Sequence, residues 1–420
     1  MQTNNDIDEG HTFRPTRRGF LRMATFGSLS IGGLGTVFGV GRVGEAMWEQ
    51  HVTWQEVTCD AATFVKKYSK KLARLHFGAS LCPDYELMAA GANPDRTVKL
   101  LKDNFGCTHV RLCMRWSTHA EQGMGAYDPW LAALLKYGIK TIVAYGAKAP
   151  FPPETHFPTE IEQNLASYGI EKGSTIYADS PLGKLTLDYS QRLLDHLETE
   201  FGLDSLYGFN PENEFDAHFG LHLLASSDDL LRAQAQLLYD PGHPRRILIN
   251  SAIISPPWQE ASLSHVVKTA LSLRQEFPTL EPIIGTDIYE ETGAGRLAAD
   301  FYVDTFAGVR LRHGDSLIPS AKRTLATAGI PLEVTEFQIS DWNDEPRQYQ
   351  PGSRIHTQYL LARMMDYLVD ETPATSPFIV RLWEMSIPLR NMLADERYFA
   401  TNDTFKLIQR LNEQNRGLLK

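Results

Sequence analysis

The sequence has few of the features that mark redox, cofactor-dependent or nucleic-acid-binding proteins. It contains four cysteines among 420 residues, none in a CxxC pair or at zinc-finger spacing from a histidine. It has no GxGxxG loop after a strand, no P-loop and no HExxH motif. We therefore expect no cofactor and no resident metal. The formal net charge is -10, and Lys and Arg do not cluster as partners such as nucleic acid or an anionic membrane surface require.

A long apolar run is also missing, although the N-terminus carries a short one. Residues 16–22 read TRRGFLR, and a Gly- and Ser-rich apolar stretch follows over residues 23–40. This pattern is typical of a twin-arginine export signal. The stretch is too rich in glycine for a good membrane anchor. We expect a periplasmic or secreted protein, with the twin-arginine translocase as a partner during export and no stable membrane insertion.

The same pattern predicts the domain organisation. Residues 1–45 form the signal peptide and leader, and residues 46–420 form one domain with an N-terminal leading helix. Export leaves two alternatives open for the cysteines. Cys82, Cys107 and Cys113 either contribute to a disulfide or are free thiols buried in strands.

Beyond residue 75, short apolar runs alternate with segments of helical periodicity. This alternation is typical of βα units around a parallel sheet. The expected strands cover residues 76–80, 109–114, 140–144, 205–210, 246–252, 282–287, 331–335 and 378–383. The expected helices cover residues 94–105, 129–137, 188–201, 228–239, 262–277, 316–328, 353–369 and 404–415. Eight such pairs predict an α/β fold, a (β/α)8 TIM barrel. A doubly wound open sheet is the alternative, but its glycine-rich loop after the first strand is missing.

Polar residues gather where several of these strands end, which is where barrel enzymes hold their active sites. The fourth strand runs into Glu212, Asn213 and Glu214, and the seventh carries Glu333 and runs into Glu336. Arg111 lies in the second strand, Tyr289 follows the sixth, and Trp383 ends the eighth. The chain therefore has carboxylates, a guanidinium and aromatic rings at one end of the expected barrel.

These motifs resemble the clan A glycoside hydrolases, the barrel group that includes cellulase-like and xylanase-like enzymes. Asn213-Glu214 matches the Asn-Glu pair of that group, and Glu336 matches its strand-seven glutamate. Val110-Arg111, Tyr289 and Trp383 match its other strand-end residues. The resemblance implies a retaining glycoside hydrolase that acts on β-linked glycosides or polysaccharides.

The resemblance also implies a role for each residue. Glu214 would be the acid/base and Glu336 the nucleophile, since a retaining glycosidase needs two carboxyl groups about 5–5.5 Å apart. The substrate-binding residues would be Arg111, Asn213, Tyr289 and Trp383. Two alternatives stay open: Glu212 competes with Glu214, and Glu333 competes with Glu336. Strict strand alternation puts Glu333 and Glu336 on opposite faces, and we prefer Glu336 because it lies nearer the strand's end.

A second function class remains open beside the enzyme. A barrel that has lost its activity could bind polysaccharide, or assist the assembly of an envelope polymer or exopolysaccharide, because fold does not secure activity. In both classes the expected partner is a carbohydrate.

Overall fold

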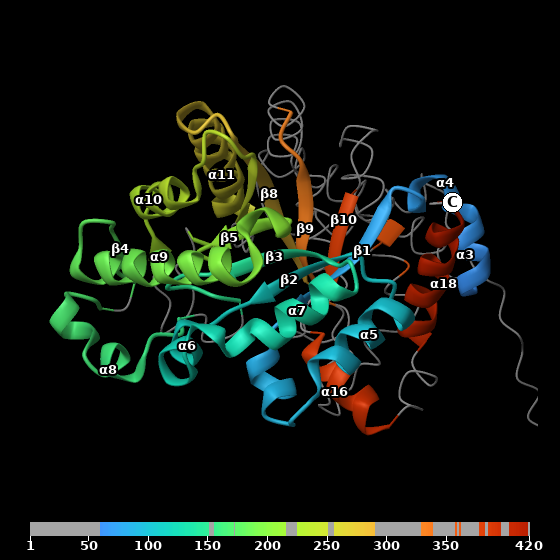
Figure 1. The fold of residues 1–420 in the computed structure, drawn as a ribbon. Coiled ribbons are helices and arrows are strands. Elements are labelled where there is room, and N and C mark those ends of the chain that lie inside the picture. Colours follow the sequence, from blue (N-terminus) through green and yellow to red (C-terminus); the bar gives the residue numbers. More distant parts are fainter. Residues whose placement is uncertain are drawn as a thin grey trace, which may run out of the picture. The chain divides into compact units, whose positions relative to one another are not determined.

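The computed structural model shows a closed barrel of parallel strands (Figure 1). Its strands, in sequence order, are β1 (Leu75–Leu81), β2 (His109–Cys113), β3 (Lys140–Tyr145), β5 (Gly208–Pro211), β7 (Arg245–Asn250), β8 (Leu280–Tyr289), β9 (Leu332–Gln338) and β10 (Phe378–Leu382). Each strand pairs with the next in this sequence, and β10 pairs with β1. The predicted (β/α)8 barrel is therefore confirmed, and the open sheet is wrong because β10 closes on β1.

The described part of the chain belongs to one compact unit that begins at Cys59. The structure describes residues 59–150, 155–171, 173–215, 225–250, 256–289, 329–338, 358, 361–362, 378–382, 385–395 and 403–418. Within these ranges, no helix is long and apolar enough to cross a membrane. The export signal and the domain boundary at residue 45 lie outside the described residues and stay predictions.

Helices lie along the outside of the strands (Figure 1). The described α-helices are α3 (Ala61–Lys67), α4 (Ser69–Leu72), α5 (Pro94–Asn104), α6 (Trp116–Gln122), α7 (Asp128–Lys136), α8 (Thr159–Glu162), α9 (Pro181–Phe201), α10 (Asp228–Leu238), α11 (Pro256–Glu276), α16 (Ser386–Ala394) and α18 (Asp403–Leu418). Helix α7 packs on β3, α11 packs on β7 and β8, and α18 packs on β1. A small two-stranded sheet, β4 (Thr175–Ile176) with β6 (Ala225–Ser226), lies outside the barrel strands.

Local capping explains where several helices begin. Asn93, Ser180 and Ser227 each accept a hydrogen bond from a backbone N–H in the first turn of the helix that follows. Proline occupies the first position of α5 and α9, where its missing N–H costs nothing. Helix α9 therefore starts at Pro181, seven residues before the expected start at 188, because Ser180 and Pro181 form a start signal.

The helix ends agree with the sequence better than the strand bounds do. Gly106 and Gly138 take positive φ values of 57° and 66°, as expected for glycines that end helices, and Gly329 has a φ of 60°. The fourth strand begins at Gly208 and not at 205, because Leu203–Ser205 form a 3-10 turn after α9. The expected helix at 316–328 and most of the one at 353–369 lie outside the described residues.

None of the four cysteines forms a disulfide in the structure. Cys82, Cys107 and Cys113 are buried thiols, so the alternative without a disulfide holds, although only Cys113 lies within a strand. Burial raises the pKa of the Cys107 thiol to about 12, which keeps it protonated and unreactive.

A buried ion pair joins β10 to β9, three residues before Glu336 along β9. Arg381 of β10 donates to Glu333 of β9 over 2.6 Å, and both side chains are buried. Tyr207 also donates its hydroxyl to Glu333, at 3.3 Å. Gly78 of β1 makes room for this pair, because a Cβ there would lie 3.1 Å from Cγ of Arg381 and 2.3 Å from the carbonyl oxygen of His109. Glu333 is therefore held as a structural carboxylate.

Two buried histidines should make the fold sensitive to acid. Burial lowers the pKa of His109 to about 2 and the pKa of His119 to about 3. Unfolding releases both to about 6.5, so the unfolded state binds protons that the folded state does not. Their contribution to stability is complete above about pH 6.5 and is lost as the pH falls, by about 1.4 kcal/mol per pH unit for each histidine.

Urea unfolding at pH 7, 6, 5 and 4 measures this slope. His119 donates to or accepts from the Tyr189 hydroxyl at 2.9 Å, and glutamine can replace that hydrogen bond without titrating. We expect His119→Gln to reduce the slope below pH 6 by about 1.4 kcal/mol per pH unit. An unchanged slope would contradict a neutral buried His119.

Candidate active site

The chain makes a strained turn where β5 ends. Glu212 and Glu214 are the described non-glycine residues with positive φ, at 57° and 44°. Residues other than glycine rarely have a positive φ. Where they do, contacts with the surrounding structure hold the backbone in place, and many such residues lie at functional sites. Here the backbone N–H of Glu212 donates to the Tyr145 carbonyl at 2.8 Å, and that of Asn213 donates to the Lys148 carbonyl at 3.0 Å. The end of β3 thus holds the turn.

A network of asparagine side chains lies beside this turn. Asn250, at the end of β7, donates to Oδ1 of Asn213 at 2.9 Å and accepts from Asn210 at 3.1 Å. The backbone N–H of Glu214 also donates to Oδ1 of Asn250, at 3.3 Å. These three buried amides fix both the side chain of Asn213 and the backbone of Glu214.

Arg111 joins this network to Glu336. One of its terminal nitrogens donates to Oδ1 of Asn213 at 3.4 Å and to Oδ1 of Asn210 at 3.5 Å. The other forms a buried ion pair with Oε1 of Glu336. The guanidinium therefore connects the end of β5 with β9, on the other side of the barrel. An arginine at this position favours the ionised form of the carboxylate that it holds.

A β-bulge in β9 determines the face of the sheet on which Glu336 lies. Gly285 and Asp287, two residues apart on β8, share one face of the sheet and pair with Glu333 and Glu336. The register shifts by one residue between these two pairs. The expectation that Glu333 and Glu336 lie on opposite faces is therefore wrong, because the bulge adds one residue between them. Each meets an arginine of its own, Glu333 with Arg381 and Glu336 with Arg111.

Glu212 and Glu214 differ in their surroundings, although both are buried. Four donors surround the carboxylate of Glu212, two on each oxygen. Burial raises the pKa of Glu212, and these hydrogen bonds act against that rise. A carboxylate whose oxygens are both occupied in this way is poorly placed to exchange a proton with a substrate. This arrangement favours Glu214 as the proposed acid/base.

Of the six proposed site residues, the structure brings together Arg111, Asn213, Glu214 and Glu336. Tyr289 is the last residue of β8, but its side chain, and the whole of Trp383, lie outside the described residues. Their roles stay predictions.

Two further residues, Asn250 and Lys148, contact the Glu212–Glu214 turn and were not predicted from the sequence. Asn250 ends an apolar strand, a position where a polar residue could have been noticed. Lys148 offered no comparable signal, because only the folded chain places its ammonium group against the carbonyl oxygen of Glu214.

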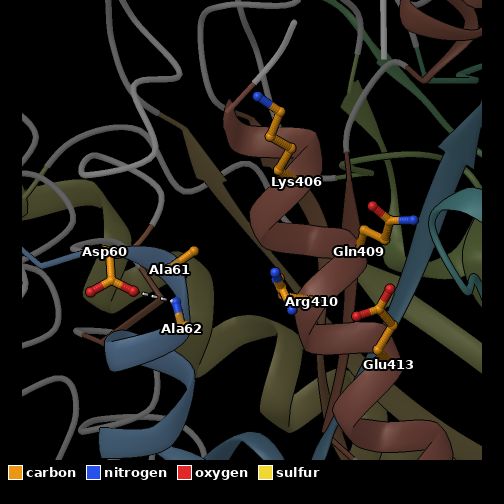
Figure 2. Close-up of a pocket in the computed structure, with 7 residues that line it drawn as sticks. All are labelled: Asp60, Ala61, Ala62, Lys406, Gln409, Arg410 and Glu413. Atoms are coloured by element: carbon orange, nitrogen blue, oxygen red, sulfur yellow. Dashed lines mark hydrogen bonds between the residues drawn. The ribbon is translucent and has the colours of Figure 1, made fainter. Parts of the chain in front are cut away.

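A separate cavity of about 440 Å³ lies between α3 and α18 (Figure 2). Its charged lining residues are Asp60, Lys406, Arg410 and Glu413, two of each sign. Asp60 is engaged as the helix cap, since it accepts from the backbone N–H of Ala62 at 2.9 Å (Figure 2). None of the proposed site residues lines this cavity.

Comparisons with known proteins show a likeness of fold but do not identify a family for this chain. No family model and no curated protein matches the sequence. A glycoside hydrolase family 30 subfamily 8 xylanase from Clostridium acetobutylicum is 15% identical, with a TM-score of 0.46 over 81% of this chain and 71% of the xylanase. A β-glucanase from Saccharophagus degradans is 11% identical, with a TM-score of 0.45 over 81% and 88%. A family 1 β-glucosidase from Thermotoga maritima is 11% identical, with a TM-score of 0.41 over 73% and 87%.

These three solved structures are a xylanase, a β-glucanase and a β-glucosidase. Identities of 11–15% express a likeness of fold alone. A shared barrel does not carry the reaction with it. The function has to be argued from the residues of this chain.

Proposed function

We propose that this protein is a retaining glycoside hydrolase that acts on β-linked glycosides, with Glu336 as the nucleophile and Glu214 as the acid/base. The observation that carries the proposal is the Arg111 bridge. It binds Glu336 of β9 on one side and Asn213, the neighbour of Glu214, on the other. The two strand ends that bear the proposed carboxylates are thereby joined through a single side chain.

The proposed reaction has two displacements. The Glu336 carboxylate attacks the anomeric carbon, the bond to the leaving oxygen breaks, and Glu214 gives its proton to that oxygen. Water then loses a proton to Glu214 and attacks the same carbon, which releases Glu336. Arg111 holds Glu336 ionised and oriented before attack, and Asn213 binds the sugar 2-hydroxyl.

The sugar stereochemistry tests this mechanism. We expect turnover of members of a panel of aryl β-glycosides and β-linked polysaccharides, with the β-anomer as the first product in proton NMR. A 2-deoxy-2-fluoro β-glycoside with a good leaving group should add its sugar mass to the peptide that contains Glu336. An α-anomer as first product, or a label on another peptide, would contradict the assignment.

The same panel separates the enzyme from the alternative function. A protein that binds the polysaccharides and turns over none of the substrates would be a barrel without activity, whose role is binding or envelope-polymer assembly. We also propose that residues 1–45 direct twin-arginine export to the periplasm or beyond. Localisation of a folded reporter fused behind these residues tests that proposal, and a reporter retained in the cytoplasm would contradict it.

A further inference from the structure

The carboxylate of Glu212 is the meeting point of three segments. Oε1 accepts from the backbone N–H of Ala147 at 2.8 Å and from Nε2 of Gln234 at 2.9 Å. Oε2 accepts from the backbone N–H of Lys148 at 3.1 Å and from the Ser226 hydroxyl at 2.7 Å. The donors come from the chain after β3, from β6 and from α10. Each oxygen thus has both of its acceptor positions filled.

The chain after β3 is shaped to receive this carboxylate. Gly146 has a φ of 124°, a backbone angle that residues with a Cβ rarely adopt. A Cβ at Gly146 would lie only 2.1 Å from Oε1 of Glu212. The glycine therefore serves both the backbone conformation and the close approach of the carboxylate.

The contacts around Glu212 also hold Glu214. Lys148, which donates its N–H to Glu212, is itself fully buried, and its ammonium group donates to the carbonyl oxygen of Glu214. Glu212 and Glu214 are the two residues with left-handed backbone in this turn. One arrangement of donors thus braces both ends of the strained segment.

We propose that Glu212 is a positioning residue, which holds the left-handed turn and so aims Glu214 at the leaving-group oxygen. This role rests on the proposed function, since it assigns Glu212 a part in the same site. Glu212 acts through the backbone of the turn and does not itself exchange a proton with the substrate.

The test uses Glu212→Gln and a milder variant, Ser226→Ala, which removes one donor and leaves the carboxylate in place. Ser190→Ala is the matched control, because Ser190 is also buried and accepts a hydrogen bond from Gln234 but has no hydrogen bond to Glu212. Each variant is assayed on aryl and alkyl β-glycosides across pH. Glu214→Gln provides the reference for a lost acid/base.

We expect Glu212→Gln to lower kcat on alkyl glycosides by about 100-fold, with a smaller loss on aryl glycosides and little change in KM, because a misaimed acid hurts poor leaving groups most. Ser226→Ala should lower it by about 10-fold, in the same pattern. Ser190→Ala should stay within about twofold of the unchanged protein. The basic limb of the pH profile should persist in Glu212→Gln and disappear in Glu214→Gln.

Two kinetic results would overturn the proposal while leaving the glycosidase function intact. Glu212→Gln could lose the basic limb and recover turnover with azide, which would make Glu212 the acid/base. The second result is that Glu212→Gln and Ser226→Ala both keep the activity of the unchanged protein. Crystal structures of both variants give a readout that needs no activity: a turn that keeps φ near 57° and 44° at Glu212 and Glu214 also overturns it.

Discussion

Glu336→Gln is expected to reduce kcat on aryl β-glycosides by a factor on the order of 10⁴ or more, the scale seen when a nucleophile is removed. Glutamine keeps the size of the side chain and its hydrogen bond from Arg111, but it cannot attack the anomeric carbon. Substrate binding should change little, so the loss should appear in kcat and not in KM. Steady-state kinetics on the best substrate of the panel measures it.

Glu333→Gln is the matched control for this prediction. Glu333 lies on the same strand and is equally buried, but it pairs with Arg381 and Tyr207. We expect this variant to lose stability and to keep its turnover per folded molecule. Turnover that survives Glu336→Gln and disappears in Glu333→Gln would reverse the assignment of the nucleophile.

Arg111→Met is expected to lower the free energy of unfolding by about 3–5 kcal/mol, the usual result of breaking a buried ion pair from one side. The side chain of Arg111 is 0% exposed and that of Glu336 is 3% exposed, so water cannot compensate the charge left behind. The same change removes the donor to Asn210 and Asn213. Urea unfolding with far-UV circular dichroism measures the loss.

A double-mutant cycle separates the ion pair from the rest of the packing. Glu336→Gln removes the buried charge that Arg111→Met leaves unpaired. The double variant should therefore lose less free energy of unfolding than the sum of the two single variants, and we expect the difference to be about 2 kcal/mol or more. Strict additivity within about 0.5 kcal/mol would show that the two side chains do not stabilise each other. Arg246, which pairs with Glu281 on the exposed surface, gives the matched comparison, since Arg246→Met should cost less than about 1 kcal/mol.

Much of the fold was predictable from local features of the sequence. The eight apolar runs lie close to the eight observed barrel strands, and Gly106 and Gly138 lie where helices end because glycine readily takes positive φ. The strand positions, together with the resemblance to clan A glycoside hydrolases, also indicated Arg111, Asn213, Glu214 and Glu336 as candidates, since a parallel barrel brings all its strand ends to one rim. Local spacing could not show the β9 bulge, which depends on how β9 pairs with both β8 and β10.

The sequence also could not distinguish Glu212 from Glu214 as the candidate acid/base. Both are glutamates in one turn, two positions apart, and no periodicity distinguishes them. The difference lies in donors that come from far along the chain, including Ser226 and Gln234, and in the room that Gly146 leaves for Glu212.

The sequence by itself determined the barrel, the order of its strands and the rim at which polar residues gather, because hydrophobic period and turn residues act over short distances. Only the tertiary structure decided which carboxylates meet which partners: Glu336 with Arg111, Glu333 with Arg381, and Glu212 with four donors. The physical reason is that buried charge must be paired within the fold, and the partners of a buried charge are chosen by proximity in space.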